Sequence, residues 1–198
     1  MKLYYSPGTC SLHPQITISE IGLPVELVRV DLRAHKTQTG ADYYAVNPKG
    51  YVPSLELDDG TILTEGAVIT QYLADQKPAA NMIPPAGTMD RYRVQEWLNF
   101  IASEIHKTFS SMFGASDEVK DQGRAKLSRR FDVVAKALQE RPYLVGDTFG
   151  VADAYLFNML MWTSFVGIDL ARWPALQAFY ARAAERPAVQ AALAAHKR

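Results

Sequence analysis

The sequence predicts a layered α/β domain followed by an all-helical domain, and two observations predict this division. Within residues 1–75, short segments that alternate apolar with polar side chains are interleaved with helical segments. Beyond the proline-rich stretch 76–87, the hydrophobic period becomes 3.6 residues and no convincing strand remains. The charge balance changes too, from 5 Lys/Arg against 9 Asp/Glu to 16 against 12. We therefore expect domains at 1–77 and 88–198, joined by a linker at 78–87.

The first domain is expected to begin with a strand, a helix and a second strand. Residues 2–5 have the composition of a short strand, and a helix is expected at about 11–21, where Gly22 stops it. In residues 26–31, valines alternate with charged side chains, which predicts the second strand. Residues 33–46 are polar and only weakly helical at their end.

A hairpin and a helix complete this domain. After Pro53, leucines alternate with polar residues up to an Asp-Gly pair that favours a tight turn. The second strand of this hairpin, at 61–63, leads to Thr64, which is a good N-cap for a helix at about 65–74. The resulting order βαβαββα fits a thioredoxin-like layer of α/β structure.

The same stretch suggests a binding site. The strand edge ahead of Pro53 is open to pairing with an extended peptide, and the helix start beside it offers N–H groups to an anion. Together these features predict a site for a small, acidic, peptide-like ligand. An ordinary hairpin leading into a helix fits the pattern as well.

The second domain is expected to be helical throughout, with helices at about 88–112, 117–140, 151–165, 174–185 and 188–196. The first helix carries two stripes. The apolar stripe comprises Val94, Trp97, Leu98, Ile101, Ile105, Phe109 and Met112. The opposite stripe comprises Asn99, Ser103, His106, Lys107 and Ser110. It holds no Glu/Lys pair, unlike an ordinary solvated face, although such a face remains the alternative. With Gly150 as N-cap of the third helix, the Asp153 carboxylate is expected to reach back to a backbone N–H.

Composition excludes several classes of protein. Lys/Arg and Asp/Glu balance at 21 each, so neither nucleic acid nor an anionic membrane is expected as a partner. The N-terminus lacks the apolar region of a signal peptide, and no stretch approaches the roughly 20 apolar residues that cross a bilayer. We expect a soluble cytoplasmic protein. Its single cysteine, Cys10, excludes an intrachain disulfide, and no His/Asp/Glu set has metal-ligand spacing, so no metal is expected.

Cys10 and His106 are candidate catalytic residues. Cys10 follows a strand and precedes a helix, where the helix dipole and free N–H groups would stabilise a thiolate and lower its pKa. A buried, inert cysteine fits this position equally well. Without a second cysteine, the chain cannot run a dithiol cycle, but a mixed disulfide with a small thiol stays open. An imidazole titrates near neutrality, so His106 suits acid–base chemistry or the orientation of a thiol.

Several motifs occur together along the chain. They are Tyr4-Tyr5-Ser6-Pro7-Gly8-Thr9-Cys10-Ser11, Asn47-Pro48-Lys49-Gly50-Tyr51-Val52-Pro53, Leu63-Thr64-Glu65-Gly66, Trp97-Leu98-Asn99-Phe100, Ser103-Glu104-Ile105-His106-Lys107 and Val151-Ala152-Asp153. Their joint pattern resembles the bacterial beta-class glutathione S-transferases over essentially the whole chain. The resemblance implies a thioredoxin-like N-terminal domain, an all-helical C-terminal domain that forms part of a homodimer interface, and glutathione as co-substrate.

The resemblance also implies roles for individual residues. Cys10 would lie beside the glutathione sulfur, and His106 would face that sulfur from the helical domain. Val52 would precede a cis-Pro53 and pair its backbone with the cysteinyl part of glutathione. Glutathione contacts are further expected from Tyr5, Ser11, Lys107 and Ser110, and from Asn99 and Glu104 toward the neighbouring subunit.

The two ends of glutathione are assigned in the same way. Glu65 would bind the ammonium of the γ-glutamyl end by its carboxylate, and Gly66 would bind the carboxylate of that end by its backbone. The family often has Lys where this chain has His35. The glycyl carboxylate would therefore be bound more weakly here, or by Lys36 instead.

The expected activity is conjugation, in which the glutathione thiolate attacks an electrophilic carbon of a small hydrophobic compound, such as a halogenated or aromatic one, in detoxification. Two alternatives stay open: a thiol-disulfide oxidoreductase that works through a Cys10 mixed disulfide, and a non-enzymatic ligand-binding protein of the same fold. The electrophile pocket is expected to use Phe109, Met112, Phe113, Met161, Trp162 and Phe165, although each also fits a core position.

Overall fold

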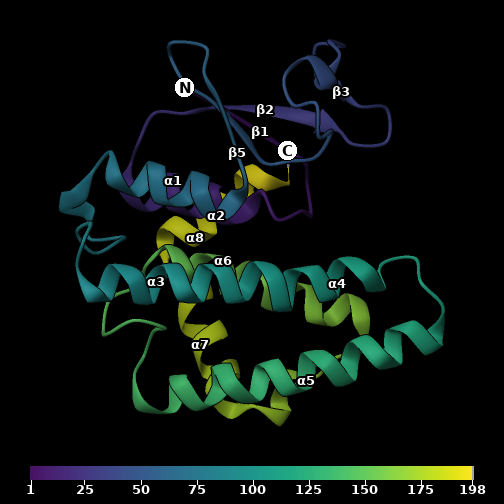
Figure 1. Ribbon diagram of the computed structural model, residues 1–198, viewed down its shortest axis with the longest axis vertical. Helices are drawn as coiled ribbons and strands as arrows, with labels where there is room; N and C mark the ends of the chain where they lie inside the picture. Colours follow the sequence, from purple (N-terminus) through teal and green to yellow (C-terminus); the bar gives the residue numbers. More distant parts are fainter. Residues whose placement is uncertain (198) are drawn as a thin grey trace. The chain divides into compact units, whose positions relative to one another are not determined.

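A computed structural model describes residues 1–197, which form two compact units (Figure 1). The first unit is Met1–Met82 together with the last helix, and the second is Ile83–Arg186. The first unit contains β1 (Lys2–Tyr5), α1 (Leu12–Ile21), β2 (Glu26–Asp31), β3 (Lys36–Thr37), η1 (Tyr43–Ala45), β4 (Ser54–Glu56), β5 (Ile62–Thr64), α2 (Gly66–Asp75), η2 (Pro78–Ala80) and α8 (Pro187–His196). The second contains α3 (Met89–Phe100), η3 (Ile101–His106), α4 (Lys107–Met112), α5 (Asp117–Glu140), α6 (Val151–Met161), η4 (Trp162–Val166), η5 (Leu170–Arg172) and α7 (Pro174–Ala184). Within residues 1–197, none of the helices is both long and apolar enough to cross a membrane.

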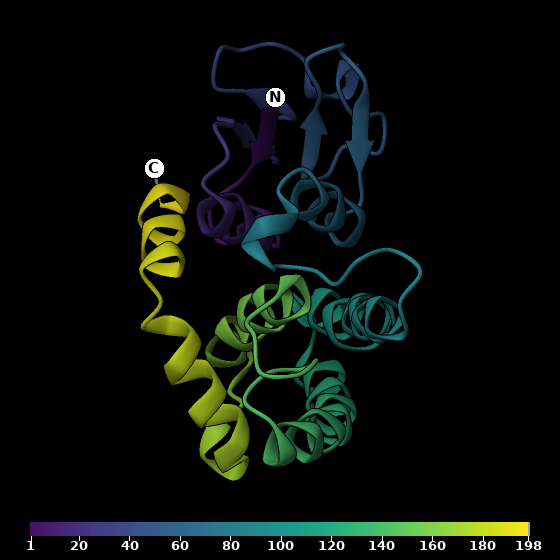
Figure 2. The same ribbon diagram turned by 90° about the vertical axis from the view of Figure 1, so that its left-hand side faces the viewer.

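The first unit is organised around a mixed sheet of five strands in the order β3-β2-β1-β4-β5. Strands β1 and β2 are parallel, and the other neighbouring strands are antiparallel. Helices α1 and α2 pack together, and α8 lies beside α1 (Figure 2). A parallel pair joined through a helix, extended by an antiparallel hairpin, is the thioredoxin-like layer predicted from the sequence.

Side chains alternate along β1 between the two faces of the sheet. Leu3 is fully buried on one face, in register with Leu55 of β4. Tyr4 points to the other face. It packs there in a core cluster with Val28, Val30, Tyr43 and Val52. This cluster anchors Val52, the residue before Pro53, to the sheet.

Two segments of the first unit differ from the sequence prediction. Region 33–46 holds the two-residue strand β3, which was not predicted, and the short 3-10 turn η1, which agrees with the weakly helical end expected there. This segment has too few apolar residues at helical spacing to bury a helix face. Helix α2 starts at Gly66, so Thr64 is not its N-cap. Thr64 is instead the last residue of β5, paired with Ser54 in the ladder, which keeps its backbone extended.

The predicted helix 88–112 is a continuous run that includes a π-helical turn. It passes from α3 through η3, which is the π turn, into α4. The Thr88 hydroxyl caps its start by accepting the Arg91 N–H at 3.2 Å. The predicted apolar stripe is buried at Val94, Leu98, Ile101, Ile105, Phe109 and Met112, while Trp97 is half-buried. A π turn holds more residues than an α turn, so it changes the direction of the side chains that follow it, beginning with Lys107.

The compact units differ from the predicted domains at the C-terminal end. The helix expected near residue 188 is α8, and it packs on α1 within the first unit. Val189, Ala192 and His196 are its buried residues. The chain thus leaves the first unit after Met82 and returns to it at Pro187.

The start of α6 has the cap that the sequence predicted. Gly150 is extended and donates its N–H to Oδ2 of Asp153 at 2.9 Å. Leu144 donates its N–H to Oδ1 of the same carboxyl, also at 2.9 Å. Burial raises the pKa of Asp153 to about 7, and the backbone donors oppose that rise. Asp153 therefore ties the preceding loop to the helix, which is a structural role.

Candidate active site

Four predicted binding segments meet at one end of the sheet. Ser54 pairs with both Tyr4 and Thr64, so the residues before β4 and those after β5 lie at the end where β1 finishes. Because β2 runs parallel to β1, the turn that leads to His35 lies at this end as well. Neighbouring strands are about 4.8 Å apart, so β2 to β5 spans roughly 14 Å, within reach of an extended peptide of about four residues.

Cys10 lies between these segments, in the turn just before α1. Its thiol donates toward the Val52 carbonyl oxygen, with 3.5 Å between sulfur and oxygen. The Val52–Pro53 bond is cis, as the resemblance implied. The structure therefore brings Cys10 next to the residue that was expected to pair with the cysteinyl part of a ligand.

The prediction that the helix start lowers the pKa of Cys10 is wrong. The amides of the first turn are already used: Leu12 donates to the Thr9 carbonyl and His13 to the Cys10 carbonyl, both at 3.4 Å. Pro14 has no N–H. Burial of the sulfur raises the pKa of Cys10 to about 12, and the negative charge of Glu65 adds to the rise.

Two further predicted contacts are buried within the first unit. Ser11 is fully buried and its hydroxyl is engaged within the loop, where it accepts the Ser6 N–H at 3.2 Å and contacts Thr9 Oγ1 at 2.7 Å. Tyr5 is buried, with its ring 5.8 Å from that of His196. Ser11 therefore shapes the loop that carries Cys10, and Tyr5 packs against α8.

Glu65 occupies an unusual backbone conformation at the start of α2. Its φ is +69° and ψ is 108°, a region that side chains other than glycine rarely adopt. Such residues concentrate at ligand clamps and active sites. At Gly66, an added Cβ would clash with the imidazole of His13 and approach Pro53. The absence of a side chain at Gly66 thus lets α2 start close against α1 and the cis-proline.

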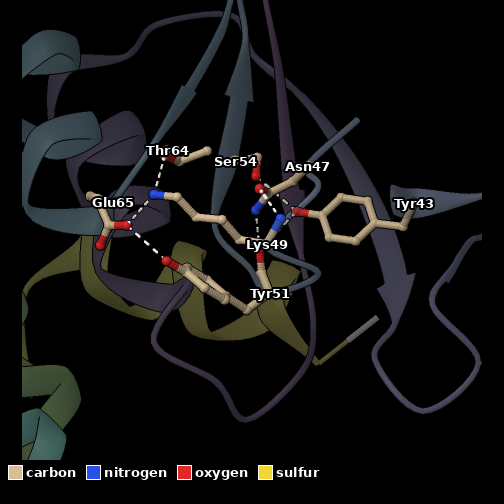
Figure 3. Close-up of polar contacts among 7 residues, drawn as sticks. All are labelled: Tyr43, Asn47, Lys49, Tyr51, Ser54, Thr64 and Glu65. Atoms are coloured by element: carbon tan, nitrogen blue, oxygen red, sulfur yellow. Dashed lines mark hydrogen bonds and ion pairs between the residues drawn. The ribbon is translucent and has the colours of Figure 1, made fainter. Parts of the chain in front are cut away.

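The Glu65 carboxylate is held by two residues that the sequence reasoning missed (Figure 3). Its Oε1 accepts hydrogen bonds from Lys49 Nζ at 2.6 Å and from Tyr51 Oη at 2.9 Å. Lys49 also donates to Thr64 Oγ1 at 3.1 Å. The hydrogen bond with Glu65 raises the pKa of Lys49. Both residues belong to the 47–53 motif, but nothing in their spacing predicts a contact with Glu65.

His35 and Lys36 lie at the opposite edge of the sheet from β5. His35 has a φ of +50° and stacks on the Tyr44 ring, with 4.4 Å between ring centroids. Lys36 is exposed in β3. Of these two candidates for a glycyl carboxylate, Lys36 is the more exposed.

The second unit carries His106. The Nδ1 atom of His106 is 2.6 Å from the hydroxyl of Tyr155, a residue that the sequence did not single out. The imidazole also meets the Trp162 ring edge-on, at 5.1 Å between centroids. Tyr155 stands out in hindsight as a buried residue with a polar tip on the mostly apolar helix α6.

The remaining candidates in the second unit fall into two groups. The exposed ones are Asn99, Lys107, Ser110, Phe113 and Phe165, whereas Phe109, Met112 and Trp162 are buried and Met161 is half-buried. Glu104 is engaged by Arg130, with Nη2 2.6 Å and Nε 2.8 Å from its Oε2, which lowers the pKa of Glu104. Among residues 1–197, no His/Cys/Asp/Glu group of three or more could hold a metal ion.

Comparison with known proteins identifies the family. Residues 9–76 match the family model "Glutathione S-transferase, N-terminal domain", and residues 100–187 match "Glutathione S-transferase, C-terminal domain". Glutathione S-transferase GstA of Escherichia coli O157:H7 is 47% identical to this chain, covering 98% of both.

Solved structures agree over the full length. A ternary complex of BphK, a bacterial glutathione transferase, is 54% identical with a TM-score of 0.97 and covers 100% of both chains. Two sphingomonad transferases each have a TM-score of 0.95 and cover 99% of this chain and 98% of theirs. One, 46% identical, is complexed with glutathione, and the other, from Sphingomonas chungbukensis and 45% identical, is of the bacterial beta class. The chain therefore belongs to the glutathione S-transferase family, as a glutathione transferase of the bacterial beta class.

Proposed function

We propose that this transferase binds glutathione along the end of its five-stranded sheet and conjugates it to small hydrophobic electrophiles, with halogenated and aromatic compounds as candidates. One observation carries the assignment of the site. Cys10, the Val52–Pro53 step and Glu65 come from three separate segments, and all lie at the same sheet end. Because the γ-glutamyl linkage runs through the side chain of the first residue, extended glutathione is longer than an ordinary tripeptide, and it suits the roughly 14 Å span with its γ-glutamyl end at Glu65.

The protein's task in this reaction is to favour the thiolate of glutathione. A thiol of pKa 8.5 is only about 3% ionised at pH 7, and lowering its pKa by two units needs about 2.7 kcal/mol. Hydrogen bonds to charged groups contribute about 1.5–3 kcal/mol each, so one or two donors suffice. We assign one of these to Cys10, which stays protonated and donates its S–H to the glutathione sulfur. The thiolate then forms the C–S bond, the leaving group departs as an anion, and the thiol proton passes to water.

The second unit is proposed to supply the imidazole and the electrophile-binding surface. His106 is oriented by the Tyr155 hydroxyl and sits against Trp162, which also contacts the exposed Phe113 ring at 5.3 Å. Phe109 and Met112 are fully buried and fit a core role better. The family also supports a cytoplasmic, homodimeric enzyme of detoxification, with Asn99 and Glu104 directed to the neighbouring subunit. Light scattering of the purified protein tests the dimer.

The test is the pH profile of conjugation with an aryl halide. In wild type, the apparent pKa of bound glutathione should lie below that of the free thiol. Cys10→Ala should raise it by about one pH unit, whereas Cys10→Ser, which keeps a hydroxyl donor, should stay near wild type. An unchanged profile in Cys10→Ala would assign thiolate stabilisation to another donor. Absence of conjugation in wild type would refute the proposal.

The redox alternative is less well supported by this site. A cysteine that forms mixed disulfides works best with a low thiol pKa, and the pKa of Cys10 is raised. Thiol-transfer activity that disappears in Cys10→Ser, without conjugation of any aryl halide, would favour the redox reading instead.

A further inference from the structure

The ion pair between Lys49 and Glu65 has a geometry suited to a ligand that carries both charges. Lys49 Nζ is 2.6 Å from Glu65 Oε1 (Figure 3), and the two side chains are 46% and 53% exposed. An exposed pair of this kind contributes little to folding, about 0–1 kcal/mol. Stability therefore gives a weak reason for placing these two charges here.

The segment that carries Lys49 is nevertheless held rigidly. The buried Asn47 donates from Nδ2 to the Tyr51 carbonyl at 2.7 Å and accepts the Lys49 N–H on Oδ1 at 3.1 Å. The Tyr43 hydroxyl, at the centre of the sheet core, also donates to the Tyr51 carbonyl, at 3.1 Å. At Gly50, with φ of +73°, an added Cβ would meet the Tyr44 ring. The loop backbone is thus fixed by buried groups, while the Lys49 ammonium stays accessible.

The γ-glutamyl end of glutathione carries an ammonium and a carboxylate on the same carbon atom. We propose that Lys49 is a glutathione-binding residue that joins the Gly66 backbone, the partner expected from the sequence, in binding the α-carboxylate of the γ-glutamyl group, while Glu65 binds the neighbouring ammonium. Lys49 and Glu65 then form a receptor for the amino-acid zwitterion, and Tyr51 keeps the Glu65 carboxylate in place when Lys49 turns to the ligand. This assignment rests on the proposed function and deepens it, because it explains how the transferase selects a thiol with a free α-amino-acid end.

A rival role for Lys49 is purely positional. Lys49 would then only hold Glu65 in place and would not touch the ligand. The two roles predict different responses to a glutathione analogue that lacks the α-carboxylate, 4-aminobutyryl-Cys-Gly. That analogue keeps the ammonium for Glu65 but leaves Lys49 without a ligand partner.

The experiment measures conjugation of one aryl halide by wild type, Lys49→Met and Lys49→Arg, with glutathione and with 4-aminobutyryl-Cys-Gly as the varied thiol. With glutathione, Lys49→Met should raise KM roughly tenfold, equivalent to about 1.4 kcal/mol, with kcat near wild type, and Lys49→Arg should recover most of the loss. With the analogue, Lys49→Met and wild type should have the same KM. Lys2→Met is the matched control, since Lys2 is another half-exposed lysine paired with a glutamate, Glu56, at 3.0 Å.

Two results would overturn the assignment. Equal rises in KM for both thiols would make Lys49 a positioning residue for Glu65, and no rise with glutathione would remove it from the site. Calorimetric titration with glutathione distinguishes a failure of the Lys49 assignment from a failure of the proposed function. A wild type that binds glutathione without conjugating it refutes the function and leaves Lys49 to be judged from Kd. A wild type that binds no glutathione overturns both.

Discussion

The reactivity of Cys10 is governed by the contacts of its own sulfur and by the use of the nearby backbone amides. The thiol points at the Val52 carbonyl, an acceptor that favours the protonated form. The first amides of α1 bond to carbonyls in the preceding turn instead of pointing at sulfur. Proximity to a helix start therefore does not by itself produce a thiolate here, and Cys10 suits hydrogen-bond donation better than nucleophilic attack.

A first prediction follows at this residue. In the ligand-free protein, alkylation of Cys10 by iodoacetamide should be far slower at pH 7 than alkylation of free glutathione, because a thiol with a pKa near 12 is almost entirely protonated there. The rate should rise about tenfold per pH unit through pH 9. Mass spectrometry of the intact protein gives the readout directly, since the chain has one cysteine. A rate that levels off near pH 7 would contradict the raised pKa.

At the scale of elements, regular periodicity predicted structure well. The helix expected at 117–140 is α5, Asp117–Glu140, where a long amphipathic pattern leaves little ambiguity. Strand β3 has two residues and no alternation to read, and it forms only because β2 offers an edge for pairing. Nothing in the sequence predicts the π turn η3 either, because its residues continue an apolar stripe that an α-helix would also show.

The cap of α6 yields a second prediction. Asp153→Ala leaves the N–H groups of Leu144 and Gly150 without their acceptor in the interior, which should lower the free energy of unfolding by about 2–4 kcal/mol. Asp153→Asn retains one acceptor oxygen and should lose less. Urea denaturation measures both. Asp147→Ala, an exposed aspartate in the same loop, should change stability by no more than about 0.5 kcal/mol. Equal effects at the two positions would contradict the capping role.

At the scale of the whole molecule, the candidate site could be predicted only in part. Family motifs located Cys10, Val52–Pro53 and Glu65, and the sheet registers bring all three to one end. The partners Lys49 and Tyr155 came only from three-dimensional contacts, because side-chain hydrogen bonds across 16 and 49 residues leave no periodic trace. The return of α8 to the first unit could not be predicted from the sequence either, because its apolar residues could pack against any neighbouring helix.

That return of the chain gives the last prediction, through His196 on α8. This imidazole is 5% exposed, lies against Tyr5, and has no hydrogen-bond partner on either nitrogen within residues 1–197. Burial lowers the pKa of His196 to about 4. Between that value and about 6.5, the pKa of an unfolded histidine, the unfolded chain binds more protons, so stability falls as pH falls through this window. The loss should reach roughly 2–3 kcal/mol near pH 4. Between pH 7.5 and pH 4.5, the urea midpoint should therefore drop less in His196→Phe and His196→Leu than in wild type. If the urea midpoint changes equally with pH in all three proteins, the packing of α8 does not depend on the charge of His196.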